Sequence, residues 1–259
     1  MKNNISALVL VKNEEESING CLKQLSFVDE IIVLDQDSQD KTCDIARKYT
    51  YKIFSTNGLA FDKNRELLAS YAKCNWLLYI DADERLTTTG ITEIKKTISQ
   101  DTFDAYYFPR RNYILGKFLK HGGWWPDYTP RLFKKNKLKG WFGQVHESPR
   151  VEGELSYLKE PINHYTARSV SAMLAKTTIW ARIEAKLYFQ AKHSKVTIFK
   201  VVKAFFSEFL SRYIIKLGFL DGRIGLVEAI YQAYHRCAVL IYLWELQTDA
   251  SAKFKQVKV

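Results

Sequence analysis

The chain has 259 residues, which is long enough to bury a substantial core. Of these residues 47% are hydrophobic and 26% are charged, as is typical of a globular protein. At this length we expect one large domain, or one domain with an appendage. The formal net charge of +11 is unusual and favours a polyanionic partner, such as nucleic acid, an anionic membrane surface or a phosphorylated substrate.

The first hundred residues alternate short apolar runs with helical patterns. Branched apolar residues at 5–11 and 30–34 predict two buried strands, and residues 51–54 and 76–80 predict a third and a fourth. Helices are expected between these strands, the last of them over residues 63–72. Because strands alternating with helices indicate βαβ units, we predict an α/β fold with a mostly parallel sheet and flanking helices.

After about residue 100 the pattern changes. Aromatic and basic residues accompany two further predicted strands, at 105–108 and 131–133. The C-terminal part is helical in pattern and basic, since residues 186–225 contain eight Lys or Arg and two Asp or Glu. We therefore predict an α/β domain over residues 1–168 and a basic amphipathic helical region over residues 169–259.

Acidic residues follow three of the predicted strands. Asp81 and Asp83 come after the fourth strand and project to the same side, because side chains alternate along a strand. Glu14 follows the first strand, and Asp35 and Asp37 end the second. The carboxyl ends of parallel strands share one edge, where ligands bind, so we expect these clusters to converge. The alternative for the aspartate pair is a solvated turn that caps the next helix.

Such a convergence predicts a site for a divalent cation and a diphosphate. Aspartate oxygens suit Mg²⁺ or Mn²⁺, and clustered carboxylates repel one another unless a cation or hydrogen-bond donors lie among them. The chain has neither a Gly-x-Gly-x-x-Gly nor a Gly-x-x-x-x-Gly-Lys loop. A nucleotide would therefore be held through a metal, which argues against dehydrogenases and P-loop kinases.

Three motifs occur in a fixed order: VLVKNE at 9–14, VLDQDSQDKT at 33–42 and IDADE at 80–84. Together they resemble the signatures of family 2 inverting glycosyltransferases with a GT-A fold, over roughly residues 5–170. Later segments are similar to a narrower branch, the lipopolysaccharide-core β-glucosyltransferases of the WaaE/KdtX type. These segments are RLF at 131–133, VHE at 145–147, NHY at 163–165 and GFLDG at 218–222.

The resemblance implies roles on the donor side. Asp83 would hold the Mg²⁺ or Mn²⁺ that bridges the diphosphate. The residues implied to contact the donor nucleotide are Val11, Asn13, Glu14, Asp35, Asp37, Lys63 and Asp81. One loop departs from the family, which commonly has Asp-Asp-Gly-Ser where this chain has Asp35-Gln36-Asp37-Ser38. The missing glycine leaves the conformation of that loop open.

An inverting transfer needs a carboxylate that takes the acceptor hydroxyl's proton as the oxygen attacks the anomeric carbon. Glu147 stands in the place of the family's acidic acceptor-side motif and is implied as that base; the alternative is a surface carboxylate paired with Arg150. His146 would orient the base and contact the acceptor, or be a packed imidazole. His164 would be a late metal or diphosphate ligand, or a structural histidine.

Aromatic and basic residues supply candidates for acceptor binding. Trp124 and Trp125, adjacent in a loop of glycines and a proline, offer flat faces for a sugar ring, as does Trp141, although indoles also fill cores. The candidates for binding phosphates of an anionic acceptor are basic residues, namely Arg110, Arg111, Arg131, Lys134 and Lys135. The alternative for each basic residue is a solvated face.

The C-terminal third contains basic amphipathic segments at 198–206 and 209–216. Such helices lie on anionic bilayers or pack their apolar faces inside the protein, and the aromatic content here favours the membrane. The polar N-terminus lacks a secretory signal, no apolar stretch reaches about 18 residues, and four scattered cysteines predict reduced thiols. We expect a cytoplasmic protein, peripheral on the inner membrane.

The resemblance thus predicts transfer of a hexose, glucose from UDP-glucose, in β-linkage onto the inner-core heptose region of lipopolysaccharide or lipooligosaccharide. Two other classes stay open. A metal-dependent nucleotidyltransferase also combines an α/β sheet with metal-binding aspartates, but the loop after the first strand does not suit a triphosphate. A nucleic-acid-binding protein fits the charge, yet no such motif is present and we expect no nucleic acid partner.

Overall fold

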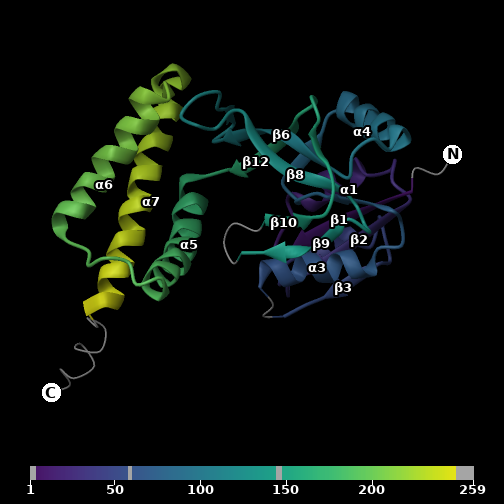
Figure 1. Ribbon diagram of the computed structural model, residues 1–259, viewed down its shortest axis with the longest axis horizontal. Coiled ribbons are helices and arrows are strands. Elements are labelled where there is room, and N and C mark those ends of the chain that lie inside the picture. Colours follow the sequence, from purple (N-terminus) through teal and green to yellow (C-terminus); the bar gives the residue numbers. More distant parts are fainter. Residues whose placement is uncertain (1–3, 58–59, 144–147, 249–259) are drawn as a thin grey trace. The chain divides into compact units, whose positions relative to one another are not determined.

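The computed structural model describes residues 4–57, 60–143 and 148–248, and every structural statement below concerns these residues. The chain folds into two compact units (Figure 1). The first comprises residues 1–111 and 126–165, and the second comprises residues 112–125 and 166–259. Residues 112–125 belong to the second unit, which the sequence did not predict.

The first unit contains four parallel strands from the first 80 residues. They lie in the order β3 (Ile53–Ser55), β2 (Glu30–Asp35), β1 (Ile5–Val11) and β4 (Trp76–Tyr79). The sheet continues through β8 (Asp127–Lys134), β6 (Ala105–Ile114), β12 (Ile162–Ala167) and β5 (Glu84–Leu86), with antiparallel pairing of β4 to β8, β8 to β6 and β12 to β5. Short strands complete this unit: β11 (Leu155–Tyr157) on β6, and the separate pair β9 (Leu138–Phe142) and β10 (Ser148–Val151).

Helices cover both faces of the parallel part of the sheet. Alternate residues of β1 from Ile5 to Val11 pack against α1 (Ile18–Lys23), α2 (Thr42–Ala46) and α4 (Thr88–Gln100). Leu8 points to the other face, where it shares a core with Leu68 of α3 (Phe61–Tyr71). A strand buried on both faces must be apolar at every position, which is why these strands read as continuous hydrophobic runs. The predicted α/β fold with flanking helices, followed by a helical segment, is confirmed.

The second unit is mostly helical. Both α5 (Val170–Gln190) and α6 (Ile198–Leu210) pack along α7 (Gly222–Thr248), and the π-helical turn η1 (Ser211–Ile215) and the 3₁₀ turn η2 (Gly218–Asp221) connect α6 to α7. The strand β7 (Lys117–Phe118) pairs with the end of β6. Within the described residues, none of the helices has the length and apolar character needed to cross a membrane.

Asp221 fastens the 112–125 segment to this helical unit. Its buried carboxylate accepts a hydrogen bond from His121 N at 2.8 Å, and its carbonyl accepts one from Lys117 Nζ at 2.5 Å. The GFLDG segment at 218–222 therefore has a structural role, because it supplies the residue that anchors the loop.

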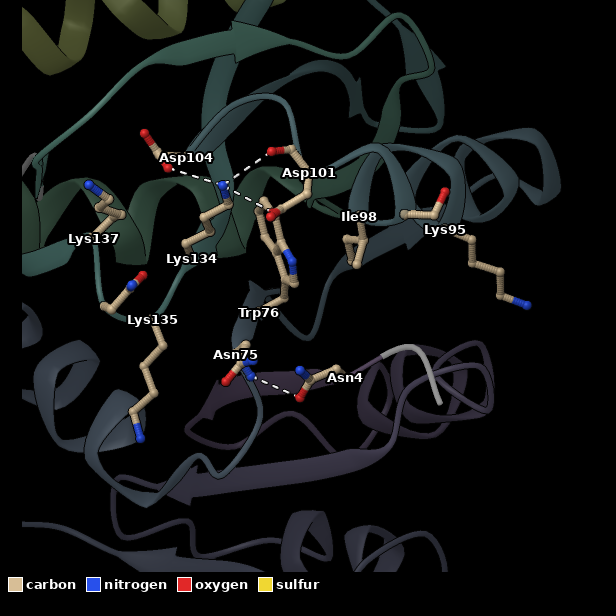
Figure 2. A pocket seen from close by; sticks show the side chains of 12 residues that line it. Asn4, Asn75, Trp76, Lys95, Ile98, Asp101, Asp104, Lys134, Lys135 and Lys137 are labelled. Atoms are coloured by element: carbon tan, nitrogen blue, oxygen red, sulfur yellow. Dashed lines mark hydrogen bonds and ion pairs between the residues drawn. The ribbon is translucent and has the colours of Figure 1, made fainter. Parts of the chain in front are cut away.

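A groove of about 1060 Å³ lies at the N-terminal ends of the parallel strands, the end opposite to the predicted site. Asn4 and Asn75 directly precede β1 and β4, and Lys134 ends β8. Figure 2 shows Lys134 between Asp101 and Asp104, with Nζ–Oδ1 distances of 3.0 and 3.2 Å. None of the predicted donor or metal residues lines this groove, whereas two of the candidate phosphate-binding residues, Lys134 and Lys135, do.

Candidate active site

The loops after β1 and β2 are joined by hydrogen bonds between backbone amides and side chains. Asn13 N donates to Ser38 Oγ at 2.8 Å, and Gln39 N donates to Asn13 Oδ1 at 2.8 Å. Glu14 N donates to Thr42 Oγ1 at 2.7 Å. Because β1 and β2 are neighbours in the sheet, their carboxyl ends meet, and the two predicted acidic loops lie side by side.

Within these loops the predicted donor residues have different environments. The side chain of Val11 is buried in the core, and its carbonyl accepts a hydrogen bond from Gln36 N at 2.9 Å. Asp35 is buried and accepts from Ser38 N at 3.2 Å. Asp37 is exposed and has φ of 63°, the left-handed conformation that favours glycine. Asp37 thus occupies the position of the family's glycine in the conformation that glycine would take.

Asp37→Gly should raise the free energy of unfolding by roughly 0.5–1 kcal/mol, because glycine adopts a positive φ without the steric cost of a Cβ. Asp37→Ala should lower it, since alanine keeps the Cβ and cannot hydrogen-bond locally. Urea unfolding of both variants measures the difference. A less stable glycine variant would show that this conformation carries no strain.

The turn after β4 presents the Asp-x-Asp motif. Asp81 N donates to Glu84 Oε2 at 3.0 Å, and Glu84 N donates to Asp81 O at 2.9 Å, so the two residues close the turn. Arg85 Nη2 donates to Ser17 O at 2.7 Å and ties this turn to the N-terminus of α1. Gly20 leaves room for that guanidinium, because a Cβ there would lie 2.7 Å from Arg85 Nη2.

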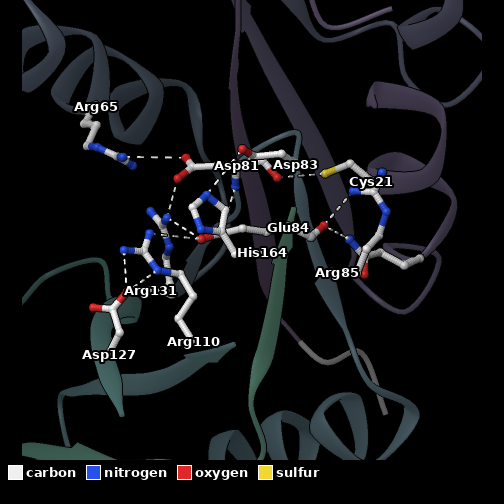
Figure 3. Close-up of polar contacts among 11 residues, drawn as sticks. Cys21, Arg65, Asp81, Asp83, Glu84, Arg85, Arg110, Asp127, Arg131 and His164 are labelled. Carbon is white, nitrogen blue, oxygen red and sulfur yellow. Dashed lines mark hydrogen bonds and ion pairs between the residues drawn. The ribbon is translucent and has the colours of Figure 1, made fainter. Parts of the chain in front are cut away.

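Arg131 links both acidic residues of this turn. Its Nη2 donates to Glu84 Oε1 at 2.6 Å and also to Asp81 Oδ2 (Figure 3). The side chain of Arg131 is 4% exposed and that of Glu84 is fully buried. Arg110 approaches the same Glu84 at 3.8 Å and pairs with Asp127 at 2.8 Å. These contacts favour a positioning role for Arg131 over the predicted binding of acceptor phosphates.

Arg65 of α3 is a site residue that the sequence reasoning missed. Its Nη2 lies 3.6 Å from Asp81 Oδ1, and its guanidinium stacks 4.9 Å from the centre of the Trp141 ring. Lys63, the predicted basic residue of this helix, is instead exposed and pairs with Glu66 at 2.8 Å. A signal was available: Arg65 lies three residues before the buried Leu68 and so shares its helix face, whereas Lys63 lies five before it.

These cations determine the charge state of Asp81. Burial disfavours its ionised form, but the guanidinium groups of Arg131 and Arg65 outweigh burial and hold the pKa of Asp81 well below its usual range. Asp81 is therefore a carboxylate at neutral pH, with its oxygens already engaged by arginines.

Asp83 lies beside His164. The pairing of β12 with β5 sets His164 opposite Glu84, and His164 Nε2 lies 3.3 Å from Asp83 Oδ2. Both side chains are partly exposed, and Tyr165 N donates to Asp83 O at 3.0 Å. The structure thus brings together the two residues predicted to bind metal, although they are 81 positions apart in the sequence.

This pair fits part of the coordination sphere of Mg²⁺ or Mn²⁺. A carboxylate oxygen and an imidazole nitrogen are ligands that Mn²⁺ accepts, and Mg²⁺ accepts the oxygen. No cluster of three or more His, Cys, Asp or Glu side chains suited to a metal occurs in the part of the chain that the structure describes. Further ligands would therefore come from water or from the oxygens of a bound diphosphate.

The predicted acceptor residues are only partly accounted for. His146 and the predicted base Glu147 lie outside the described residues. Trp124 and Trp125 belong to the second unit, where the Arg212 guanidinium lies 5.9 Å from the Trp124 ring and Phe118 packs edge-on against Trp125.

Trp141 is a core residue. It is 6% exposed and packs edge-on against Tyr79 and Phe133. The Arg65 guanidinium stacks on the Trp141 ring, so this buried indole helps to hold Arg65 beside Asp81.

Comparison with known proteins places this arrangement in a family. Residues 6–151 match the sequence profile of Glycosyl transferase family 2. An uncharacterized glycosyltransferase of Rickettsia conorii is 26% identical over 274 residues, and the alignment covers 98% of this chain and 93% of that protein. The prophage-derived glycosyltransferase SunS of Bacillus subtilis is 26% identical over 155 residues, covering 56% of this chain and 34% of SunS.

Solved structures give weaker similarity. Residues 1–349 of S. aureus TarS in complex with UDP-GlcNAc give a TM-score of 0.46 at 13% identity, covering 98% of this chain and 92% of TarS. Glucosyl-3-phosphoglycerate synthase of Mycobacterium tuberculosis with Mn²⁺, UDP-glucose and glycerol 3-phosphate gives 0.38 at 16% identity, covering 52% and 57%. The sequence match spans more than half of the chain and includes the loops after β1, β2 and β4, so the chain belongs to glycosyl transferase family 2.

Proposed function

We propose that the chain is a metal-dependent, inverting glycosyltransferase that moves glucose from UDP-glucose, in β-linkage, onto the inner-core heptose region of lipopolysaccharide or lipooligosaccharide. Metal dependence is supported by one observation: Asp83 pairs with His164, close to Asp81, which Arg131 binds. The identities of the sugar and the acceptor rest on the resemblance of the segments at 131–133, 163–165 and 218–222.

In this proposal each residue has one task. Asp83 and His164 would hold Mg²⁺ or Mn²⁺, and a bound cation would stabilise negative charge on the departing diphosphate. Asp81, fixed by Arg131 and Arg65, faces the ribose of the donor. Asn13, Glu14, Asp35 and Asp37 surround the nucleoside, and Trp124, Trp125 and His146 contact the acceptor.

Glu147 takes the proton of the acceptor hydroxyl as that oxygen attacks the anomeric carbon. Attack from the face opposite to the diphosphate inverts the configuration, so an α-linked donor gives a β-linked product. Because the proposed acceptor is anchored in lipid, the chain works at the cytoplasmic face of the inner membrane.

Glu147→Gln should reduce transfer from UDP-glucose to a heptose acceptor by roughly 10²–10⁴-fold, because the amide cannot accept the proton. Binding of UDP-glucose should be unchanged. Radiolabelled transfer measures the first, and thermal stabilisation by the donor measures the second.

Glu154→Gln is the matched control, since Glu154 is an exposed carboxylate in the same part of the chain. A Glu147→Gln variant with wild-type transfer would place the base elsewhere. An α-linked product in the NMR spectrum of the wild-type reaction would contradict inversion.

A further inference from the structure

The helix α6 carries an apolar strip that no other described residue covers. Ile198, Val202, Phe206 and Leu210 follow one another at intervals of four residues, so they share one face of the helix. Their exposed fractions lie between 47% and 80%. No residue of α6 or η1 is buried, although the opposite side of α6 packs along α7.

The strip continues beyond the end of α6. Its further members are apolar residues that are at least 42% exposed: Phe199 of α6 and, after α6, Ile214, Ile215, Leu217, Phe219 and Leu220. Single exposed apolar side chains are ordinary on a protein surface, but ten of them within 23 consecutive residues, Ile198 to Leu220, indicate an interaction site. We call these ten residues the apolar strip.

Basic residues accompany the strip along its length. Residues 195–217 contain five Lys or Arg and one Asp or Glu. The acidic residue, Glu208, is paired with Arg212 at 2.6 Å, so the four lysines set the charge of this surface. Lys195 and Lys203 are exposed and stand within five residues of Ile198 in the sequence.

We propose that the apolar strip inserts into the headgroup region of an anionic lipid bilayer, with α6 lying in the plane of the membrane. An amphipathic helix with aromatic and branched residues on one face and lysines beside it binds such interfaces in two ways. Its apolar side chains are buried in the bilayer, and its lysines attract anionic lipids. The lysines are complementary to anionic headgroups.

A second copy of the chain is a poorer partner for this surface. In a two-fold symmetric dimer the same patch faces itself, so the lysines of one copy would meet those of the other. The whole chain also carries a net charge of +11, which opposes self-association at this basic surface. Charge complementarity therefore favours the lipid.

The apolar strip is the proposed membrane-docking surface. Only the reason for docking, access to a lipid-linked acceptor, rests on the proposed function. Vesicle binding needs no donor, and donor binding needs no vesicle. The two proposals can therefore fail separately.

The test is co-sedimentation of the full chain with vesicles of phosphatidylcholine containing one-third phosphatidylglycerol. The double variant Phe199→Ser with Phe206→Ser should bind at least about tenfold more weakly, because two aromatic side chains no longer enter the interface. Lys195→Gln with Lys203→Gln should lose about fivefold per lysine, and wild-type binding should weaken as salt rises.

Tyr51→Ser is the control, since Tyr51 is 96% exposed in the first unit. All variants should keep their circular dichroism spectra and their stabilisation by UDP-glucose with Mn²⁺. Equal vesicle binding by the phenylalanine variant and wild type would overturn the proposal. So would a dimer that the same variant converts to monomer while neither protein binds vesicles.

Discussion

Arg131→Met should lower the free energy of unfolding by about 3–5 kcal/mol, the cost of removing one partner from a buried ion pair. The change leaves the fully buried Glu84 without its nearest cation, and Arg110, at 3.8 Å, is too distant to replace the hydrogen bond. Asp81 loses its closest guanidinium as well. Urea unfolding at neutral pH measures the loss.

Lys139→Met is the matched control, because Lys139 pairs with Glu152 at 3.0 Å and both side chains are largely exposed. An exposed pair of this kind contributes less than about 1 kcal/mol. Equal losses in the two variants would mean that the buried network around Arg131 does not stabilise the fold.

The difference between wild type and Arg131→Met should depend on pH. Folding lowers the pKa of Asp81, so this residue contributes stability above its ordinary pKa of about 4, and that contribution is lost as pH falls towards the folded-state value. The variant lacks the main cation that lowers the pKa. The stability gap should therefore be full at neutral pH and shrink in acid.

Asp83→Asn should reduce metal-dependent turnover of UDP-glucose by at least about 100-fold, the order found when one electrostatic contact to a developing charge is removed. Asparagine keeps the size of the side chain and its contact with His164, but it lacks the negative charge that a divalent cation requires. The Mn²⁺ concentration for half-maximal activity should rise in parallel. Release of UDP, followed over a Mn²⁺ titration, measures both.

Asp44→Asn is the control, since Asp44 is an exposed carboxylate that pairs with Arg47 at 2.6 Å. His164→Gln should weaken Mn²⁺ affinity without removing all activity, because one ligand of the pair remains. Full Mn²⁺-dependent turnover by Asp83→Asn would remove the assigned metal role.

The sequence predicted the parts of the site that depend on local patterns. The runs at 5–11, 30–34 and 76–80 are continuous apolar strands because both faces of the sheet are covered, and the acidic loops follow from strand ends on a parallel sheet. The left-handed residue at Asp37 was not predicted. Its place in the motif could have indicated this conformation. The family commonly has a glycine there, which is typical of a positive φ, and aspartate tolerates a positive φ.

The sequence did not predict the long-range contacts of Arg131. Arg131 reads as one of many basic residues, and only the antiparallel pairing of β8 with β4 brings it to Asp81 and Glu84, about 50 positions away. Residues 112–125 belong to the helical unit, where His121 N bonds Asp221, a contact about 100 positions away that no local pattern indicates. Contacts across such separations depend on the whole fold rather than on propensity.

The most direct test of nucleotide-sugar transfer is the melting temperature of the full chain with a panel of UDP-sugars in Mn²⁺. UDP-glucose at about 100 times its dissociation constant should raise the melting temperature by roughly 5–10 °C, and chelation of the metal should remove the increase. Asp83→Asn should show little or none of it. No shift with any UDP-sugar, together with stabilisation by a nucleoside triphosphate or by nucleic acid, would contradict the account.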